Sequence, residues 1–295
     1  MKILALDIGG TAIKAGIFRE NGIIDETTEY QTNRHEGGQK LMERILEITN
    51  SYRGIDRIGI SATGQIDSAS GSVIYGTDSL PGWPGTRIKE LIEKSMGVHV
   101  AVENDANAAA LGEAYYGSGR GIPDFLCLTY GTGVGGAIIQ SGRIYRGSSG
   151  SAAEFGHIIT HVGGRKCMCG GYGCYEEYAS ATVLCKNVAE ALGIKEIDGR
   201  EVFRLLSENN ADVKKQVDGW INEVVTGLVS LVYIFNPSCI ILGGGVMSQP
   251  YIIDAVEKSL PSHVMPSFRK LSVKKASLGN LAGLYGAMHS VMNLD

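Results

Sequence analysis

Four residues in the middle of the chain have the types and spacing of a metal site. Three cysteines in a C-x-C-x₄-C pattern follow a histidine: His157, Cys167, Cys169 and Cys174. Three thiolates and one imidazole make a closed tetrahedral set for Zn²⁺, and closed sites are structural. Glycines among the cysteines suit a backbone that wraps an ion, whereas three core thiols would lie in a helix or strand. His161 is an alternative fourth ligand that spacing alone does not exclude.

Two glutamates flank this cluster. Glu154 lies just before His157, and Glu176 follows Cys174. A metal that folds the loop would also fix both carboxylates, which can accept hydrogen bonds from a ligand with many hydroxyl groups. The alternative interpretation is solvated surface charge, which is the usual state of an isolated Glu.

Two glycine-rich turns follow apolar, strand-like runs, at Asp7–Thr11 and Tyr130–Gly133. Backbone N–H groups at such turns can cradle phosphate oxygens, although many glycine-rich hairpins are only tight turns. Asp7 would suit Mg²⁺ through water. A third cluster, Gly243–Gly245, either lets a nucleotide base or ribose approach the backbone or is a plain strand-to-helix turn. Because these turns lie on other strands than the cysteines, we expect loss of the metal to leave phosphate binding at the turns little changed.

Residues 131–136 also match the G-x-G-x-x-G pattern of dinucleotide-binding oxidoreductases. That pattern requires a helix directly after the glycines. Residues 137–145 instead have the pattern of a β-hairpin, which argues against this alternative.

Asp105 is the best candidate for a catalytic base. It ends an apolar run and opens an Ala-rich helix, whose N-terminal dipole would hold the carboxylate ionised and able to take a hydroxyl proton. The alternative is a plain helix N-cap. The neighbouring Asn104 adds an amide for ligand hydroxyls.

Strands and helices alternate along the chain. Apolar runs predict strands at 2–8, 12–18, 57–62, 98–102, 125–129, 137–140 and 239–242. Helical spacing predicts helices at 38–52, 87–96, 106–116, 180–192, 199–209, 213–235 and 281–292. Both halves begin with a strand, a glycine-rich turn and a strand, so we expect paired α/β domains around a cleft.

Composition limits the possible partners. The chain has 295 residues, 44% of them hydrophobic, a net charge of −4 and no Lys/Arg block, which argues against nucleic acid. The first strand follows Met1 and Lys2, which leaves no room for a signal peptide, and we expect no apolar run long enough to span a bilayer. A cytoplasmic protein without a membrane partner is therefore expected. Cys127, Cys185 and Cys239 are interpreted as reduced core thiols.

Taken together, the motifs resemble the ROK family of bacterial sugar kinases over essentially the whole chain. They are D-I-G-G-T at 7–11, E-N-D-A-N at 103–107, G-T-G-V-G at 131–135, E-F-G-H at 154–157 and the cysteine cluster through Glu176. The cysteine cluster with its E-x-G-H element is specific to that family. The glycine turns are shared more widely with actin-like phosphotransferases.

The resemblance implies a fold and a set of roles. The fold would be α/β, with two actin-like (ribonuclease H-like) domains and a cleft between them, and the family commonly forms homodimers. The domains would be 1–117, completed by the C-terminal helix 281–295, and 118–280, which carries the zinc-binding loop. Asp105 would be the general base toward the sugar 6-hydroxyl. The residues that contact the sugar would be Gly64, Ser79, Asn104, Asp105, Glu154, His157 and Glu176. Those that bind ATP and Mg²⁺ would be Asp7, Gly9, Gly10, Thr11, Thr132, Gly133 and Gly244. The ligands of Zn²⁺ would be His157, Cys167, Cys169 and Cys174.

Three positions depart from the family pattern. Ala12 stands where many members have Lys, Thr63 replaces a Pro, and Ser79 replaces the Asn that precedes Leu-Pro-Gly-Trp in glucokinases. Because Ser79 is shorter, N-acetylmannosamine or a β-glucoside competes with glucose as the substrate, and we place glucose first. ROK repressors share these motifs but carry a DNA-binding segment before the first strand, so a kinase is favoured.

Overall fold

The structure is a computed structural model that describes residues 1–76 and 80–293. The described chain forms two compact units built from interleaved segments. The first unit comprises Met1–Gly121, Gly142–Ala152 and Asn280–Asp295, and the second comprises Ile122–Ser141 and Ala153–Gly279. Ser79 lies outside the described residues.

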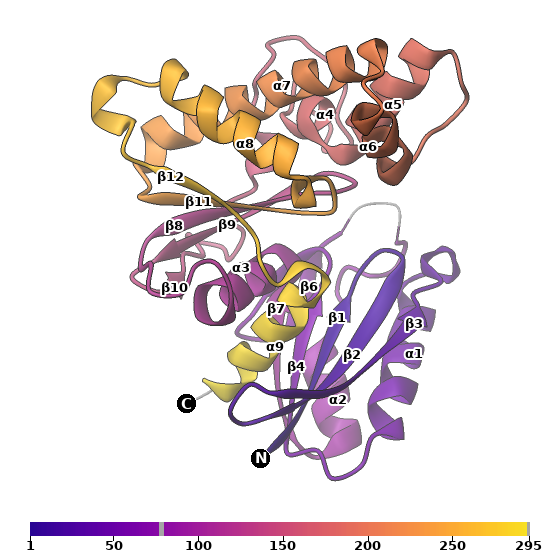
Figure 1. The fold of residues 1–295 in the computed structure, drawn as a ribbon. Helices are drawn as coiled ribbons and strands as arrows, with labels where there is room; N and C mark the ends of the chain where they lie inside the picture. Colours follow the sequence, from indigo (N-terminus) through magenta and orange to yellow (C-terminus); the bar gives the residue numbers. More distant parts are fainter. Residues whose placement is uncertain (77–79, 294–295) are drawn as a thin grey trace. The chain divides into compact units, whose positions relative to one another are not determined.

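The first unit is built on a sheet with the strand order β3-β2-β1-β4-β7 (Figure 1). Its strands are β1 (Lys2–Ile8), β2 (Ala12–Arg19), β3 (Ile24–Gln31), β4 (Arg57–Ala62) and β7 (His99–Asn104). β1 pairs antiparallel with β2, which pairs antiparallel with β3, whereas β1, β4 and β7 are parallel. The carboxyl ends of β1, β4 and β7 therefore meet at one edge, which is where parallel sheets place ligand-binding residues.

Both faces of this sheet are covered because its central strands are apolar on both sides. Side chains of β1 alternate between a cluster with α1 (Gly38–Ser51) and α2 (Ile88–Met96) and a cluster with α9 (Ala282–Met292). Helix α3 (Asp105–Tyr116) packs against α9. A Cβ at Gly286 would lie 1.7 Å from the Ala108 carbonyl oxygen, so this crossing requires glycine. The unit also contains η1 (Arg34–Glu36), β5 (Gln65–Asp67), β6 (Ser72–Tyr75), β10 (Arg143–Ile144) and η6 (Gly279–Leu281) at its border.

The second unit repeats the central topology of the first. Its strands β9 (Val134–Gln140), β8 (Phe125–Tyr130), β11 (Cys239–Gly243) and β12 (Ser272–Lys275) lie in that order. β8 pairs antiparallel with β9 and parallel with β11, as β1 does with β2 and β4. β9 begins inside the G-x-G-x-x-G match, so no helix follows the glycines and the dinucleotide alternative is excluded.

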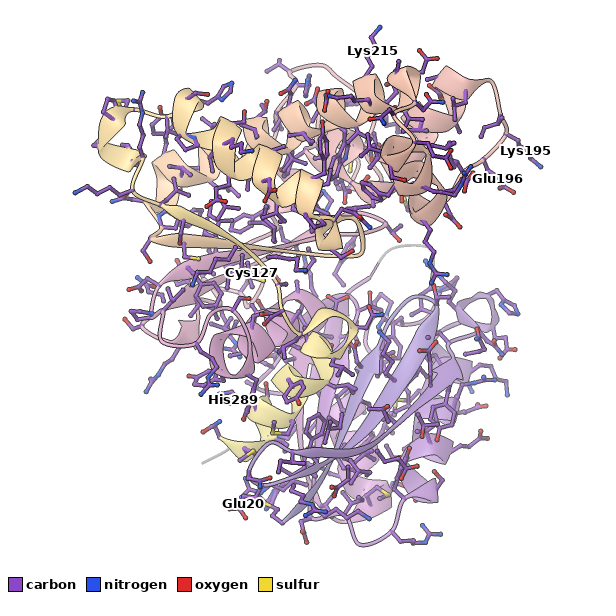
Figure 2. The ribbon with its side chains drawn as sticks, in the orientation of Figure 1. Glu20, Cys127, Lys195, Glu196, Lys215 and His289 are labelled. Carbon is purple, nitrogen blue, oxygen red and sulfur yellow. The ribbon has the colours of Figure 1, made fainter. Side chains whose placement is uncertain are left out.

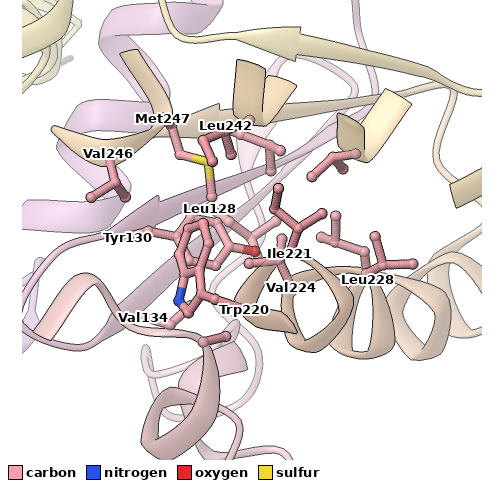
Figure 3. Close-up of a cluster of buried hydrophobic side chains, with 14 of the residues drawn as sticks. Leu128, Tyr130, Val134, Trp220, Ile221, Val224, Leu228, Leu242, Val246 and Met247 are labelled. Atoms are coloured by element: carbon pink, nitrogen blue, oxygen red, sulfur yellow. The ribbon is translucent and has the colours of Figure 1, made fainter. Parts of the chain in front are cut away.

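Helices and short turns complete the second unit. They are η2 (Phe155–His157), α4 (Glu176–Ala179), α5 (Ala181–Leu192), α6 (Gly199–Ser207), α7 (Ala211–Phe235), η3 (Val246–Ser248), α8 (Pro250–Ser259), η4 (Leu260–His263) and η5 (Pro266–Phe268). The core joins β8 and β11 to α7: Leu128 and Leu242 lie in one cluster with Trp220 and Leu228 (Figure 3). Burial of these side chains stabilises the unit by about 1.5–3 kcal/mol each.

One sequence expectation about apolar runs was wrong. Among the described residues, α7 is long and apolar enough to cross a membrane by length and composition. Half of its most apolar window is buried inside the structure, however, and a core helix passes the same test. We therefore interpret α7 as a core helix.

Most predicted elements are present with shifts of one to three residues, but others were missed, among them β3, β12 and α8. β3 reads I-D-E-T-T-E-Y-Q and β12 reads S-V-K-K; both are edge strands whose polar composition hides the period-2 signal. α8 begins with Pro250 at its first position, which suits a helix N-terminus. Edge positions need few apolar residues, so hydrophobic pattern alone does not find them.

Candidate active site and metal centre

Asp105 opens α3, and the residue that caps this helix is its neighbour. Asn104 is the N-cap: its Oδ1 accepts hydrogen bonds from the backbone N–H groups of Ala106 at 3.0 Å and Asn107 at 3.1 Å. Asp105 occupies the first helical position, and its Oδ1 accepts from the Ala106 N–H at 2.9 Å. The plain N-cap interpretation of Asp105 is therefore wrong, because the cap position is already filled.

The Asn104 side chain also joins two predicted sugar-site residues. Its Nδ2 donates to the Gly64 carbonyl oxygen at 2.9 Å and to Asp105 Oδ1 at 2.9 Å. Both ends of the amide are thus used inside the protein, which fixes Asp105 relative to the backbone at Gly64. Asn104 consequently positions Gly64 and Asp105. The sequence suggested only that its amide contacts ligand hydroxyls.

Asp7 lies at the end of β1 in a polar row across the sheet. The register places Lys14 of β2 on one side of it and Ser61 of β4 on the other. Ser61 Oγ donates to Asp7 Oδ1 at 2.6 Å. Burial raises the pKa of Asp7, while the Ser61 hydrogen bond and the Lys14 ammonium oppose that rise. A carboxylate at the end of a parallel strand suits a divalent cation, so Asp7 fits a role in holding hydrated Mg²⁺.

The first glycine turn is closed by its own backbone and by two neighbouring side chains. The Gly9 N–H donates to the Ala12 carbonyl at 3.0 Å, and Thr32 Oγ1 donates to the Gly9 carbonyl at 2.8 Å. A Cβ at Gly10 would lie 3.2 Å from Nη1 of Arg34, so a guanidinium lies beside the turn. A cation in this position suits a phosphate group.

The second glycine turn connects β8 to β9. The Gly131 N–H donates to the Gly133 carbonyl at 3.0 Å, and Thr132 is exposed. Gly244, at the end of β11, packs directly on the backbone at the start of this turn. A Cβ there would lie 2.1 Å from the Tyr130 carbonyl oxygen, and φ is +102°, so only glycine fits.

The structure gathers the predicted metal ligands into one group. One ligand atom from each of four residues lies within 4.8 Å of all the others: His157, Cys167, Cys169 and Cys174. Sγ of Cys167 is 3.7 Å from Nδ1 of His157, and Sγ of Cys169 is 3.6 Å from Sγ of Cys174. These two distances match two opposite edges of a tetrahedron of ligand atoms around Zn²⁺, in which Zn–S and Zn–N bonds are about 2.3 and 2.0–2.1 Å long.

His161 has other partners. Its Nε2 lies 3.6 Å from Oε2 of Glu223, and its ring stacks on Tyr178 at a centroid distance of 3.8 Å. Thr160 Oγ1 lies 3.1 Å from its Nδ1. Within the described residues, the group of potential ligands thus contains His157 and not His161.

The three thiols of the metal group lie in different surroundings. Burial raises the pKa of the Cys167 and Cys174 thiols, whereas the backbone N–H of Gly171 is the main group that lowers the pKa of Cys169. Two buried thiols become thiolates only when a cation offsets their desolvation. Three sulfurs and one imidazole therefore fit Zn²⁺ in donor type and in number.

Glu176 lies against this group, as the sequence suggested. Its Oε1 is 3.6 Å from His157 Nδ1 and 3.2 Å from Cys167 Sγ. Glu154 caps η2, is exposed, and accepts a hydrogen bond from the His157 N–H through its carbonyl at 3.0 Å. The second unit therefore presents two carboxylates and an imidazole around one short loop.

Sequence reasoning missed the side chains that support the turn at Asn104 and Asp105. Glu103 is only 2% exposed; its Oε1 accepts from the Asn104 N–H at 3.1 Å and from Asn107 Nδ2 at 3.0 Å. Its Oε2 forms an ion pair with Arg146. The sequence contained a signal, because a charged residue such as Glu103 within an apolar strand run implies a buried partner. It does not indicate which residue that partner is.

Two sheets with the same central topology, each with a glycine turn after its first strand, define the actin-like class of α/β proteins expected from the sequence. Within that class, the chain belongs to the ROK family, whose family model matches residues 3–293.

Relatives match the chain along nearly its whole length. A β-glucoside kinase of Listeria monocytogenes is 34% identical over 293 residues, which cover 98% of this chain and 97% of the relative. The structure of a ROK family glucokinase from Streptomyces griseus with glucose and AMPPNP has a TM-score of 0.89 and 31% identity, and covers 99% of each chain. A candidate N-acetylmannosamine kinase from Listeria monocytogenes has a TM-score of 0.88 and 32% identity, and covers 98% of each chain. The chain therefore groups with the sugar kinases of the family.

Proposed function

We propose that this protein transfers the γ-phosphate of ATP to the 6-hydroxyl of a hexose. One observation carries the proposal: Asp105 occupies the first position of a helix that Asn104 already caps. Its carboxylate is therefore not needed as the cap and lies at the positive end of the helix, which favours the ionised form. An ionised carboxylate held in this way can act as a general base toward a hydroxyl group.

The chemistry of the proposed step is simple. Asp105 accepts the proton of the sugar 6-hydroxyl while the oxygen attacks the γ-phosphorus of ATP. The bond between the γ-phosphorus and the β,γ-bridging oxygen breaks, and ADP leaves with that electron pair. Mg²⁺ would neutralise charge on the phosphates, and Asp7 would hold it through water. The protein mainly positions the reactants, as phosphoryl transfer generally requires.

We propose further roles for residues of each unit. In the first unit, Gly64, Asn104 and Ser79 would contact the sugar, with Ser79 outside the described residues. In the second, Glu154, His157 and Glu176 would contact its other hydroxyls. The ATP phosphates would lie on the backbone and hydroxyl groups of Gly9, Gly10, Thr11, Thr132 and Gly133, and Gly244 would border the adenosine. The glycine turns at the ends of β1 and β8 support these roles.

We propose Zn²⁺ in the group formed by His157, Cys167, Cys169 and Cys174. The loop from Cys167 to Cys174 has little apolar content, so it gains its shape from ligation and not from a core. A fixed loop holds His157 and Glu176 to the tolerance that sugar recognition demands, about half an ångström. The metal would thus be structural.

We also propose which sugar is phosphorylated. We place glucose first, and the glucokinase relative with bound glucose supports that choice. A β-glucoside and N-acetylmannosamine are the alternatives, supported by the names of the other two relatives. We also propose a cytoplasmic homodimer without a nucleic acid or membrane partner, and domains divided at residue 117.

A phosphorylation assay with Mg²⁺ and ATP tests the proposal. Glucose, mannose, N-acetylmannosamine and cellobiose are offered separately, and ADP release is measured together with the phosphorylated product. We expect one hexose to be used with a kcat/KM at least about tenfold above the others. Sugar binding without ATP consumption would instead make the protein a sugar sensor or binding module.

A further inference from the structure

The residues that follow the last cysteine of the metal group contact the second glycine turn at three points. We call Tyr175–Ala181 the tether segment and Gly131–Gly133 the phosphate turn. All of these residues belong to the second unit. The sequence predicted that binding at the phosphate turn does not depend on the metal, because the cysteines and the phosphate turn lie on different elements.

The first contact is a pair of buried tyrosines. The hydroxyls of Tyr130 and Tyr175 are 2.8 Å apart, and both side chains are 0% exposed. Tyr175 donates its only hydroxyl proton to the Val224 carbonyl at 2.8 Å. Tyr130 therefore donates to Tyr175, and the pair leaves no hydroxyl proton without an acceptor. This chain of bonds fixes the residue directly before the phosphate turn.

The surrounding core holds the tyrosine pair in place. Figure 3 shows Tyr130 among core side chains that include Trp220 and Val224. The Trp220 ring packs edge-on against Tyr130 at a centroid distance of 6.2 Å. The Trp220 indole N–H donates to the Ser180 carbonyl at 3.1 Å, so the same helix that contacts Tyr130 also holds the tether segment.

The second contact is the carboxylate of Glu176. A Cβ at Gly133 would lie only 2.4 Å from Glu176 Oε2, so the carboxylate lies directly on the phosphate turn. The other oxygen, Oε1, is 3.2 Å from Cys167 Sγ and 3.6 Å from His157 Nδ1. One side chain thus contacts the metal group and the phosphate turn at the same time.

The third contact is a backbone hydrogen bond. The Ala181 N–H donates to the Gly131 carbonyl at 3.0 Å, and the Gly131 N–H donates to the Gly133 carbonyl at 3.0 Å. The carbonyl groups at both ends of the turn are therefore engaged, and the first of them depends on the tether segment. A turn fixed in this way has its remaining groups preorganised for a ligand.

We propose that the tether segment fixes the shape of the phosphate turn, with Tyr175 as a positioning residue, so that the metal group controls affinity for ATP as well as for sugar. The proposal rests on the proposed function. Cys174 immediately precedes Tyr175, so the start of the tether segment is placed by a metal ligand. Loss of the metal frees this cysteine and relaxes the contacts that follow.

Nucleotide binding without sugar tests the proposal directly. Calorimetry measures the Kd of AMPPNP with Mg²⁺ restored in excess, for the zinc-loaded protein and for protein treated with a zinc chelator. We expect the Kd to rise about tenfold after zinc removal, and amide exchange at 131–133 to become faster. A chelated protein that keeps its circular dichroism spectrum, its AMPPNP affinity and its slow exchange overturns the proposal.

Deletion of a single hydroxyl group provides the second test. It shows whether the tether segment controls AMPPNP affinity even if chelation unfolds the protein. Tyr175→Phe should weaken AMPPNP binding about three- to tenfold while zinc content and sugar KM stay as in the wild type. Tyr130→Phe should act similarly, and the double variant should be no weaker than either single one. Tyr233→Phe is the matched control, because its hydroxyl accepts from the Met265 N–H elsewhere in the unit. Wild-type AMPPNP affinity in Tyr175→Phe overturns the proposal.

Failure of the proposed function is a separate outcome. A wild-type protein that binds AMPPNP but phosphorylates no sugar overturns the kinase assignment alone, because the binding comparisons still report on the tether segment. A wild-type protein with no affinity for AMPPNP overturns both.

Discussion

Arg146 forms an ion pair with Glu103, the buried carboxylate two positions before Asp105. The two partners are 43 residues apart in the chain, and Arg146 also donates to Ser68 Oγ at 2.8 Å. Because Glu103 also accepts a hydrogen bond from the Asn104 N–H, this pair connects the segment 142–152 to the turn at Asn104 and Asp105.

Removing Arg146 should therefore impair both folding and turnover. Arg146→Met leaves the Glu103 carboxylate without its cation. Because the Arg146 side chain is 40% exposed, we expect a cost below the value of about 3–5 kcal/mol that is typical of a fully buried pair. We expect a lower free energy of unfolding in urea and a kcat reduced about tenfold or more. Arg143→Gln, an exposed arginine three residues earlier, is the matched control and should behave as the wild type. An unchanged kcat in Arg146→Met would show that the pair does not support the base.

Ser61→Ala removes the hydroxyl that donates to Asp7. Since this hydrogen bond opposes the rise in the Asp7 pKa, its loss should raise that pKa further. The ionised form would then be lost at higher pH, so the acid side of the kcat/KM profile for Mg²⁺-ATP should move upward. Ser70→Ala is the control, because the Ser70 hydroxyl donates to a different carboxylate, that of Asp67. Identical pH profiles for Ser61→Ala and wild type would contradict this role.

Asp105→Asn should lower kcat by about 10²-fold or more, because an amide cannot accept the hydroxyl proton. The sugar KM should stay within a few-fold, since the amide still forms hydrogen bonds. Asp212→Asn is a matched control: it lies in the first turn of α7, behind the cap Asn210, which accepts from two backbone N–H groups as Asn104 does. Near-normal turnover of Asp105→Asn would remove this residue from catalysis.

Cys169→Ala removes one proposed zinc ligand and should lower the zinc content measured by atomic absorption. His157 and Glu176 then lose their fixed positions, so we expect the sugar KM to rise about tenfold or more. Cys185→Ala, a half-buried cysteine outside the metal group, should retain both zinc and sugar affinity. A variant that loses zinc but keeps its sugar KM would show that the metal does not organise the loop.

His289 on α9 should make stability depend on pH (Figure 2). Burial lowers its pKa from 6.5 to about 4, and its ring stacks on Tyr115 at a centroid distance of 3.7 Å. Between pH 4 and pH 6.5 the unfolded chain binds more protons at His289 than the folded chain does. The contribution of His289 to the free energy of unfolding is therefore present above pH 6.5 and is lost as the pH falls toward 4. We expect it to be no more than about 2 kcal/mol, because the ring is partly solvated.

His289→Phe keeps an aromatic ring and removes the titration. Urea unfolding from pH 4 to 7 should therefore show a flatter pH dependence than in the wild type. His263→Gln, an exposed histidine, is the control. Parallel curves for wild type and His289→Phe would be the contrary result.

Local features could be predicted from the sequence. The glycine turns, the strand and helix that meet at Asp105, and the cysteines with their glycines are each set within a few residues. In such short stretches backbone conformation and ligand spacing follow from residue type. The two-unit α/β topology followed from the order of these local patterns.

Only the tertiary structure decided which distant groups meet. It grouped His157 and not His161 with the cysteines, and it paired Glu103 with Arg146. It also joined Tyr130 to Tyr175, 45 residues away, and so connected the second glycine turn to the loop of the cysteines. These partners depend on strand pairing and helix packing across the core, and no local pattern encodes them because the energy that selects them comes from burial of the whole set.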